Sequence, residues 1–207
     1  MEVRKEGIYL ETGTGERRRI GYEYFPDLGI HSYILQKGVD EKTDLVLFKF
    51  LGASAIVEGD LERGLVFVNI KPTTLVKYTT DVVQFVRKNL VLEIQKDVVS
   101  PDILRRIKKF AQDRDVLLSV DDYGKEGSRI ERIEVLQPAY VKIDLSASED
   151  RFDFVLWAFE EIKKVSPRSQ VILKNVETEE DLEKMISFGI NLWQGKLERK
   201  LVLTRGP

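Results

Sequence analysis

The sequence contains no cysteine, which excludes disulfide bonds, thiolate metal sites and cysteine nucleophiles. It contains a single histidine, His31, which argues against a multi-histidine metal site and against a serine–histidine triad. His31 lies far from any polar cluster, and we interpret it as an ordinary side chain. There is no signal peptide and no apolar run of membrane length, so we expect a cytoplasmic protein.

An excess of charge of one sign is also missing. The chain has 33 basic and 35 acidic residues and a net charge of -2, so it lacks the basic field typical of nucleic-acid-binding proteins. The dense basic run is Arg17–Arg19, which we interpret as a solvated turn or strand edge and not as a phosphate site. With 207 residues, 43% of them hydrophobic, we expect a single domain over residues 1–207.

Short apolar runs alternate with helical patterns along most of the chain. The predicted strands cover residues 8–10, 20–25, 65–70, 90–94, 116–120, 139–143, 170–174, 190–193 and 201–204, with a turn at residues 12–15 between the first two. The predicted helices cover residues 72–90, 101–114, 128–136, 149–165 and 179–188, with Pro72 and Pro101 in first turns and Ser100, Ser148 and Thr178 as caps. Residues 40–57 fit a strand or a helix, and their length and alanine and leucine content favour a helix.

This alternation predicts a parallel sheet, and continuous apolar strands indicate a sheet that is buried on both faces. No glycine-rich phosphate loop follows the first strand, which counts against a dinucleotide-binding sheet. The number of strand–helix units in 207 residues favours an α/β fold of the (β/α) barrel type over an open two-sided sheet.

Polar residues recur at the carboxyl ends of the predicted strands. The apolar run that begins at Leu117 leads directly into Asp121 and Asp122, and adjacent carboxylates are costly to bury without a metal ion, a basic partner or water. The strand-end set comprises Asn69, Glu93, Asp121, Asp122, Lys142, Lys174 and Gln194, and Glu23 lies within the predicted strand at residues 20–25. Because strand ends meet in a barrel, we expect one site, whose oxygen ligands suit Mg²⁺, Mn²⁺ or Ca²⁺.

Seven short motifs then follow one another in the order of a known family. They read GYEYF at 21–25, FVNIKP at 67–72, LEIQK at 92–96, DDYG at 121–124, VKID at 141–144, VETEE at 176–180 and QG at 194–195. In this order they resemble the motifs of the EAL domains, the bacterial signalling phosphodiesterases that hydrolyse cyclic di-GMP. The resemblance extends from about residue 8 to residue 197 and implies a TIM-barrel-like EAL fold.

The resemblance also implies a role for each matching residue. The first metal ion would be held by Glu23, Asn69, Glu93 and Asp121. Asp122 would help to hold a second ion, Lys142 would contact the phosphate and the attacking water, and Gln194 would line the site. The implied cofactor is Mg²⁺ or Mn²⁺, with Ca²⁺ as an inhibitor.

Several positions depart from the family's pattern. Lys174 replaces a glutamate that binds the second metal ion and is the proposed general base, and an ammonium group cannot bind Mg²⁺. Asp27 falls where the family has an arginine that meets the dinucleotide phosphate. Lys96 replaces a glutamate that steadies the loop after the paired aspartates, and that loop, residues 123–128, is itself altered. Glu177 matches the family, and we assign it a structural role.

Three functions remain open at this stage. The favoured one is a divergent signalling protein that is impaired in hydrolysis and acts by binding a protein partner or the nucleotide. The alternatives are an active metal-dependent phosphodiesterase that produces linear pGpG, and a purely structural or dimerisation module. Four carboxylates face two lysines, so we expect one divalent ion at most. We expect no nucleic-acid or membrane partner, and a homodimer remains open.

Overall fold

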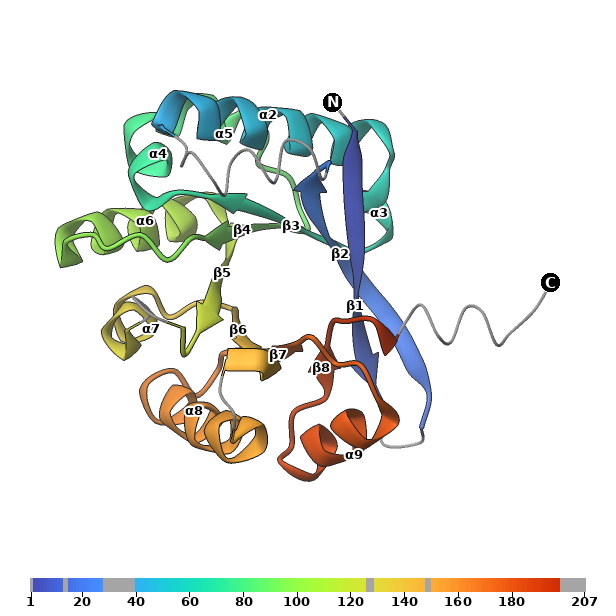
Figure 1. Ribbon diagram of the computed structural model, residues 1–207. Helices are drawn as coiled ribbons and strands as arrows, with labels where there is room; N and C mark the ends of the chain where they lie inside the picture. Colours follow the sequence, from blue (N-terminus) through green and yellow to red (C-terminus); the bar gives the residue numbers. More distant parts are fainter. Residues whose placement is uncertain (1, 13–14, 28–39, 126–128, 148–149, 198–207) are drawn as a thin grey trace.

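The computed structural model describes residues 2–12, 15–27, 40–125, 129–147 and 150–197. Its strands close into a barrel in chain order, which confirms the predicted barrel fold (Figure 1). The strands are β1 (Val3–Glu11), β2 (Arg17–Pro26), β3 (Leu65–Ile70), β4 (Leu90–Ile94), β5 (Leu117–Tyr123), β6 (Tyr140–Asp144), β7 (Gln170–Lys174) and β8 (Leu192–Trp193). The helices are α2 (Glu41–Val57), α3 (Asp60–Arg63), α4 (Pro72–Lys77), α5 (Thr79–Val83), α6 (Pro101–Arg114), α7 (Ile130–Leu136), α8 (Arg151–Val165) and α9 (Glu179–Ser187), with a short 3₁₀ turn, η1 (Leu145–Ala147).

The first strand runs against its neighbours, which the alternating pattern did not predict. β1 pairs antiparallel with both β2 and β8, whereas the remaining pairs of neighbouring strands are parallel. The connection from β1 to β2 is short, and a short connection can join only antiparallel strands. The barrel therefore begins with a hairpin and continues with parallel strands and helical crossovers.

The predicted helix over residues 72–90 is wrong in its length. α4 ends at Lys77, Tyr78 has non-helical dihedral angles (φ -115°, ψ 35°), and α5 ends at Val83. The hydroxyl of Thr79 donates to the carbonyl of Leu75 at 2.8 Å, a local bond that competes with a regular helix. Proline at the first position started the helix as predicted, but the helix is interrupted at Tyr78, and residues 84–89 are not helical.

Other predicted elements are confirmed with small shifts in their bounds. Residues 65–70, 90–94 and 170–174 are strands, and residues 40–57 hold a helix as favoured. Thr178 caps α9, since its hydroxyl accepts from the Asp181 amide at 3.0 Å while the Asp181 carboxylate accepts from the Thr178 amide at 3.1 Å. Ser100 makes no side-chain cap. The predictions for Ser148, His31 and residues 201–204 lie outside the described residues.

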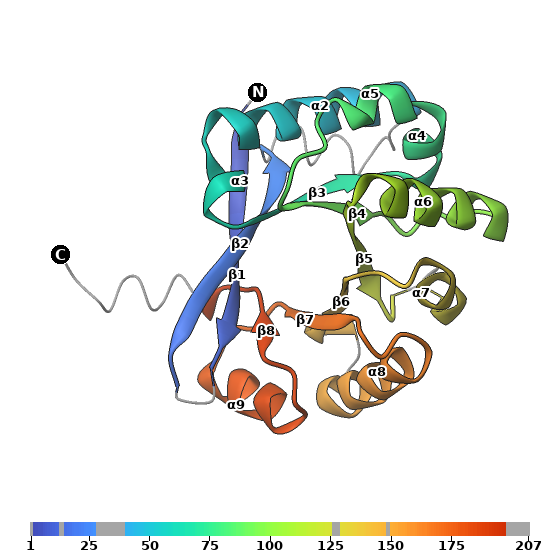
Figure 2. The ribbon, with the colours of Figure 1, turned by 180° about the vertical axis from the view of Figure 1, so that it is seen from behind.

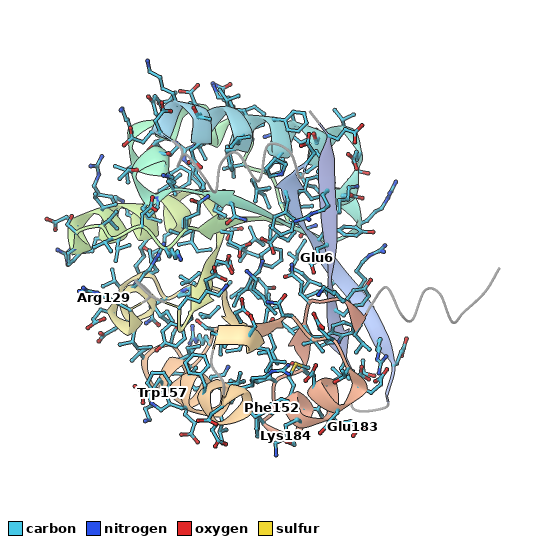
Figure 3. The ribbon with its side chains drawn as sticks, in the orientation of Figure 1. Glu6, Arg129, Phe152, Trp157, Glu183 and Lys184 are labelled. Atoms are coloured by element: carbon cyan, nitrogen blue, oxygen red, sulfur yellow. The ribbon has the colours of Figure 1, made fainter. Side chains whose placement is uncertain are left out.

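The hydrophobic core has two layers. The larger layer lies between the strands and the helices, which surround the barrel on its outside (Figure 2). The smaller layer, here called the plug, fills the interior of the barrel and consists of Ile8, Phe67, Val91, Ile172 and Leu192. Figure 3 shows side chains filling the space inside the ring of strands. Within the described residues, no helix has the length and apolar character needed to cross a membrane.

Candidate functional site

Three strands of the barrel bring acidic side chains together, Glu93 and Asp121 from the predicted strand-end set and Glu23 from within β2. Glu23 comes from β2, Glu93 from β4 and Asp121 from β5, and one carboxylate oxygen of each lies within 4.8 Å of the others. Asn69 stands beside Glu93 in the β3–β4 register. We call the group of Glu23, Glu93 and Asp121 the acidic triad.

Lys142 neutralises the buried part of the triad. Its Nζ lies 2.6 Å from Oε2 of Glu23 and 2.7 Å from Oε2 of Glu93, and all three residues are fully buried. Burial lowers the pKa of Lys142, but the charges of Glu23 and Glu93 outweigh it and hold the pKa above its ordinary value. Lys142 therefore stays protonated as a fixed cation within the site.

The two glutamates respond to this environment in opposite ways. Burial raises the pKa of Glu23, but Lys142 and Lys174 more than offset it, and the net pKa lies below its usual range. Glu23 also accepts from Nδ2 of Asn69 at 3.1 Å and from Nε2 of Gln194 at 2.8 Å. For Glu93, burial and the neighbouring charge of Glu23 raise the pKa well above its ordinary value. Glu93 is therefore the acid of the pair that still needs a cation or a proton.

A break in β5 turns both aspartates toward the same partner. Adjacent residues of a regular strand point to opposite faces, yet the β5–β6 register shifts between Val120 and Tyr123, and Asp122 has a left-handed backbone (φ 52°). The irregularity allows Asp121 and Asp122 to share one side-chain partner. That partner is Lys174 at the end of β7.

Lys174 Nζ lies 2.8 Å from Oδ1 of Asp121 and 3.1 Å from Oδ1 of Asp122. Burial lowers the pKa of Lys174, but the carboxylates of Asp121 and Glu23, followed by that of Asp122, raise it well above its ordinary value. A permanent positive charge therefore occupies the space between the paired aspartates.

Two further residues belong to this end of the barrel and were not predicted. Lys125 Nζ lies 3.2 Å from Oδ1 of Asp122 and 2.5 Å from Oδ2 of Asp144. Asp144 also accepts from Oγ of Ser146 at 2.6 Å and from Nδ2 of Asn175 at 2.7 Å. Burial raises the pKa of Asp144, but the hydrogen bonds from Lys125, Ser146 and Asn175 bring it well below its ordinary value. The position of Asp144 at the end of the predicted strand was the available signal.

Other predicted residues make their contacts elsewhere. The backbone amide of Asp27 donates to the carbonyl of Glu2 at 2.9 Å, beside the β1–β2 hairpin. Lys96 is exposed after β4, and Glu177 forms a salt bridge with Lys196 at 2.7 Å. Glu6, labelled in Figure 3, stands opposite Glu23 in the β1–β2 register.

The residues of the triad fit one divalent cation. Oε1 of Glu93 and Oε1 of Gln194 are buried and have no hydrogen-bond partner, and a buried acceptor without a donor is an unusual cost in a folded protein. Carboxylate and amide oxygens are the ligands that Mg²⁺, Mn²⁺ and Ca²⁺ prefer. Glu23, Glu93 and Asp121 therefore form a group that could hold such an ion.

Comparisons with known proteins agree with this geometry. The family model for the EAL domain matches residues 53–199. The structure is similar to that of the Bacillus subtilis YkuI protein, which has an EAL domain and was solved with cyclic di-GMP and calcium (TM-score 0.74, 20% identity, 94% of this chain and 54% of that chain). It is also similar to Klebsiella pneumoniae BlrP1 in a calcium and cyclic di-GMP complex (TM-score 0.74, 17% identity, 94% of this chain and 54% of that chain).

A third similar structure is a standalone EAL protein of Vibrio cholerae in its cyclic di-GMP-bound form (TM-score 0.69, 18% identity, 94% of this chain and 90% of that chain). At these identities the likeness shows a shared fold. The present chain spans about half of the length of the YkuI and BlrP1 chains. Among curated proteins, no sequence match is found.

Proposed function

The chain belongs to the EAL domain family, and we propose that it is a signalling member that has lost most or all cyclic di-GMP hydrolysis. In this proposal it acts in the cytoplasm by binding a protein partner or, less tightly than its relatives, the nucleotide. The observation that carries the proposal is the position of Lys174, whose ammonium group contacts both Asp121 and Asp122.

Lys174 affects two parts of the chemistry that the resemblance implies. A glutamate at this position would act as a general base, and losing a general base costs about 10²–10⁴ in rate. Lys174 also engages Asp122, the residue that would help to hold a second metal ion. Without that ion, the clamp on the attacking and leaving oxygens is missing. Both effects act in the direction of lost hydrolysis.

The first metal position supports binding of one ion. We propose that Glu23, Asn69, Glu93 and Asp121 hold a single Mg²⁺ or Mn²⁺. When bound, such an ion would polarise a phosphate oxygen. Lys142 holds the Glu23 and Glu93 carboxylates in place, and Gln194 orients Glu23 through the hydrogen bond to its Oε2. These residues favour retention of a binding site over retention of a complete catalytic site.

Asp27 is the reason why we propose weak nucleotide binding. Asp27 falls where the resemblance places an arginine for the dinucleotide phosphate, so this position carries the charge of the wrong sign. The expected consequence is weakened nucleotide binding. Calorimetric titration with cyclic di-GMP measures this directly, and we expect a dissociation constant above that of an Asp27→Arg variant.

The test of lost hydrolysis is an assay of cyclic di-GMP with Mg²⁺ and with Mn²⁺, in which the linear product is separated by chromatography. We expect no product above that of an Asp121→Asn control, which lacks a carboxylate of the triad. Linear product formed at an ordinary turnover rate, on the order of 1 s⁻¹ or faster, would contradict the proposal.

An active phosphodiesterase that releases linear pGpG is the second candidate. It is favoured by the intact triad and by the unpartnered Oε1 of Glu93, which together leave room for a catalytic ion. This reading requires a measurable wild-type activity that Asp121→Asn abolishes. If the wild-type protein has no activity to abolish, the second candidate is excluded.

A further inference from the structure

A cavity of about 610 Å³ lies at the end of the barrel opposite the acidic triad. Its wall includes Leu65, Tyr140, Gln170 and Leu192, the first residues of β3, β6, β7 and β8. Parallel strands begin at one end of a barrel and finish at the other, so this cavity is at the amino-terminal end. Its volume is within the range of small-molecule sites, roughly 300–1,000 Å³.

The plug separates this cavity from the acidic triad. Phe67 is fully buried within the plug, and its ring contacts the ring of Tyr140, which lines the cavity, at a centroid distance of 5.2 Å. Lys142, which holds the triad, places its Nζ 4.9 Å from the centroid of the same ring. The cavity is therefore a separate feature and not an extension of the metal site.

The polar lining of the cavity is basic. Arg18, Arg19 and Arg63 contribute to its wall, together with the amide side chains of Gln170 and Asn191. Among the described residues, no aspartate or glutamate lines it. The guanidinium groups of Arg18 and Arg63, at a cavity without a lining carboxylate, create a positive potential that favours an anion, whereas the Arg19 side chain stacks on Tyr22 on the other face of β2.

The strand register explains how neighbouring arginines come to serve different purposes. Arg18 pairs with Leu10, which packs against the plug, so Arg18 is on the face of β2 that is directed to the barrel interior. Arg17 is on the opposite face, where it binds Glu11 at 2.8 Å and Glu179 of α9 at 2.5 Å. Arg17 is thus a structural residue, and Arg18 is directed to the cavity.

The cavity arginines lack strong internal partners. Within the described part of the chain, neither Arg18 nor Arg19 forms a salt bridge, and Arg19 stacks on the ring of Tyr22 at 4.4 Å. Arg63 reaches Asp60 only at 3.5 Å, and 74% of its side chain is exposed. Guanidinium groups bind phosphate oxygens in a bidentate manner when they are available to do so. The floor is apolar, with Leu65 and Leu192 beside Tyr140.

We propose that this cavity is a second binding site, which takes a small phosphate monoester with an apolar or aromatic body. Arg18 and Arg63 hold the phosphate, and the body of the ligand rests on the side chains of Tyr140 and Leu65. This assignment gives the basic run at residues 17–19 a role that its interpretation as a solvated strand edge did not include. The site does not depend on a metal ion or on hydrolysis of cyclic di-GMP.

The test is isothermal titration calorimetry of the whole chain with phenyl phosphate, inorganic phosphate and phenol, each titrated separately in the absence of divalent ions. We expect phenyl phosphate to bind at least about tenfold more tightly than either of the other two probes. Arg18→Gln should weaken its binding by at least about tenfold, because it removes one guanidinium–phosphate contact. Because no metal ion is present, the result is independent of the proposed loss of hydrolysis.

The matched control is Arg105→Gln, which removes the same charge from an exposed side chain on α6 that does not line the cavity. Its affinity for phenyl phosphate should equal that of the wild-type protein. In nuclear magnetic resonance spectra of the wild-type protein, the amide chemical-shift changes caused by phenyl phosphate should be centred on Leu65, Tyr140 and Leu192. Equal affinity in the Arg18→Gln variant, shifts confined to the triad, or no saturable binding to the wild-type chain would overturn the proposal.

Discussion

The two ends of the barrel handle charge in opposite ways. At the carboxyl end, acidic side chains from four strands are matched inside the fold by Lys125, Lys142 and Lys174. At the amino-terminal end, Arg18 and Arg63 stand at a cavity whose lining, over the described residues, has no carboxylate. The first arrangement satisfies most of its charges internally, and the second leaves its charges available to a ligand.

The difference indicates what each set of charges contributes. A buried ion pair whose partners are both present changes the free energy of unfolding little. Removing one partner leaves the other charge buried in a medium of low polarity without compensation. An exposed arginine without a partner contributes almost nothing to folding, so its removal affects only what binds there. Substitutions at the two ends should therefore separate stability from binding.

The largest expected effect comes from Lys142→Met. This change leaves Glu23 and Glu93 buried together without their shared cation, and we expect it to lower the free energy of unfolding by about 3–5 kcal/mol. Urea denaturation followed by circular dichroism measures the loss.

Lys164→Met is the control, because Lys164 is exposed and pairs with Glu161 on the surface of α8. Its replacement should change the free energy of unfolding by less than about 0.5 kcal/mol. Adding Glu23→Gln to Lys142→Met should recover part of the loss. A Lys142→Met protein as stable as the control would show that Glu23 and Glu93 do not depend on this lysine.

The next largest effect concerns Asp144, whose pKa in the folded protein is held below its ordinary value of 3.8. A depressed folded pKa stabilises the protein above the unfolded pKa, and that contribution is lost as the pH falls through the folded value. We expect Asp144→Asn to cost about 1–3 kcal/mol near pH 7. The difference from the wild-type protein should shrink as the pH drops below 3.8. Urea denaturation at a series of pH values measures it, and a difference that grows in acid would reverse the assignment.

A smaller effect is expected for metal affinity in Lys174→Met. The ammonium group repels a divalent ion at the adjacent triad, so its removal should raise Mn²⁺ affinity by at least about tenfold, or about 1.4 kcal/mol. Calorimetric titration with Mn²⁺ measures the change, and Lys196→Met, at an exposed pair with Glu177, should leave affinity unchanged. Unchanged affinity in Lys174→Met would mean that its charge does not act on the metal position.

The smallest effect is expected at the other end. Arg18→Gln should change the free energy of unfolding by less than about 0.5 kcal/mol, since Arg18 has no salt bridge among the described residues. A loss greater than 1 kcal/mol in urea denaturation would show that this arginine supports the fold, and the contrast between the two ends would then disappear.

The sequence predicted the barrel and the gathering of the triad because both follow from local pattern. Apolar strands that end in Asn69, Glu93 and Asp121 must deliver those side chains to one end of a parallel barrel. The antiparallel direction of β1 follows from its short connection to β2, but its closure with β8 at the far end of the chain could not be predicted from local pattern.

Side-chain partners at the site were less accessible to prediction. The sequence identified Lys174 as a cation in the place of a glutamate. Its contacts with Asp121 and Asp122 depend on the left-handed backbone of Asp122, which no residue pattern predicts. Lys125 and Asp144 were missed because their ion pair joins the last residue of β6 to a residue that follows β5, and the sequence does not show that the two meet. The basic run at 17–19 divided into a structural and an available arginine only once the strand register was known.

The closing strand, β8, has a consequence for motion. It is two residues long and pairs at two positions with each neighbour, β1 and β7. On the β1 side, the Glu11 amide also donates to the Asn191 carbonyl at 2.8 Å, and the rings of Tyr9 and Trp193 stack at 4.9 Å. Because both pairings of β8 are this short, we expect the barrel to open locally at β8 before its longer pairings separate. Gln194 follows β8 directly and donates a hydrogen bond to Glu23. Local opening at β8 would therefore break that hydrogen bond while β4 keeps Glu93 in place.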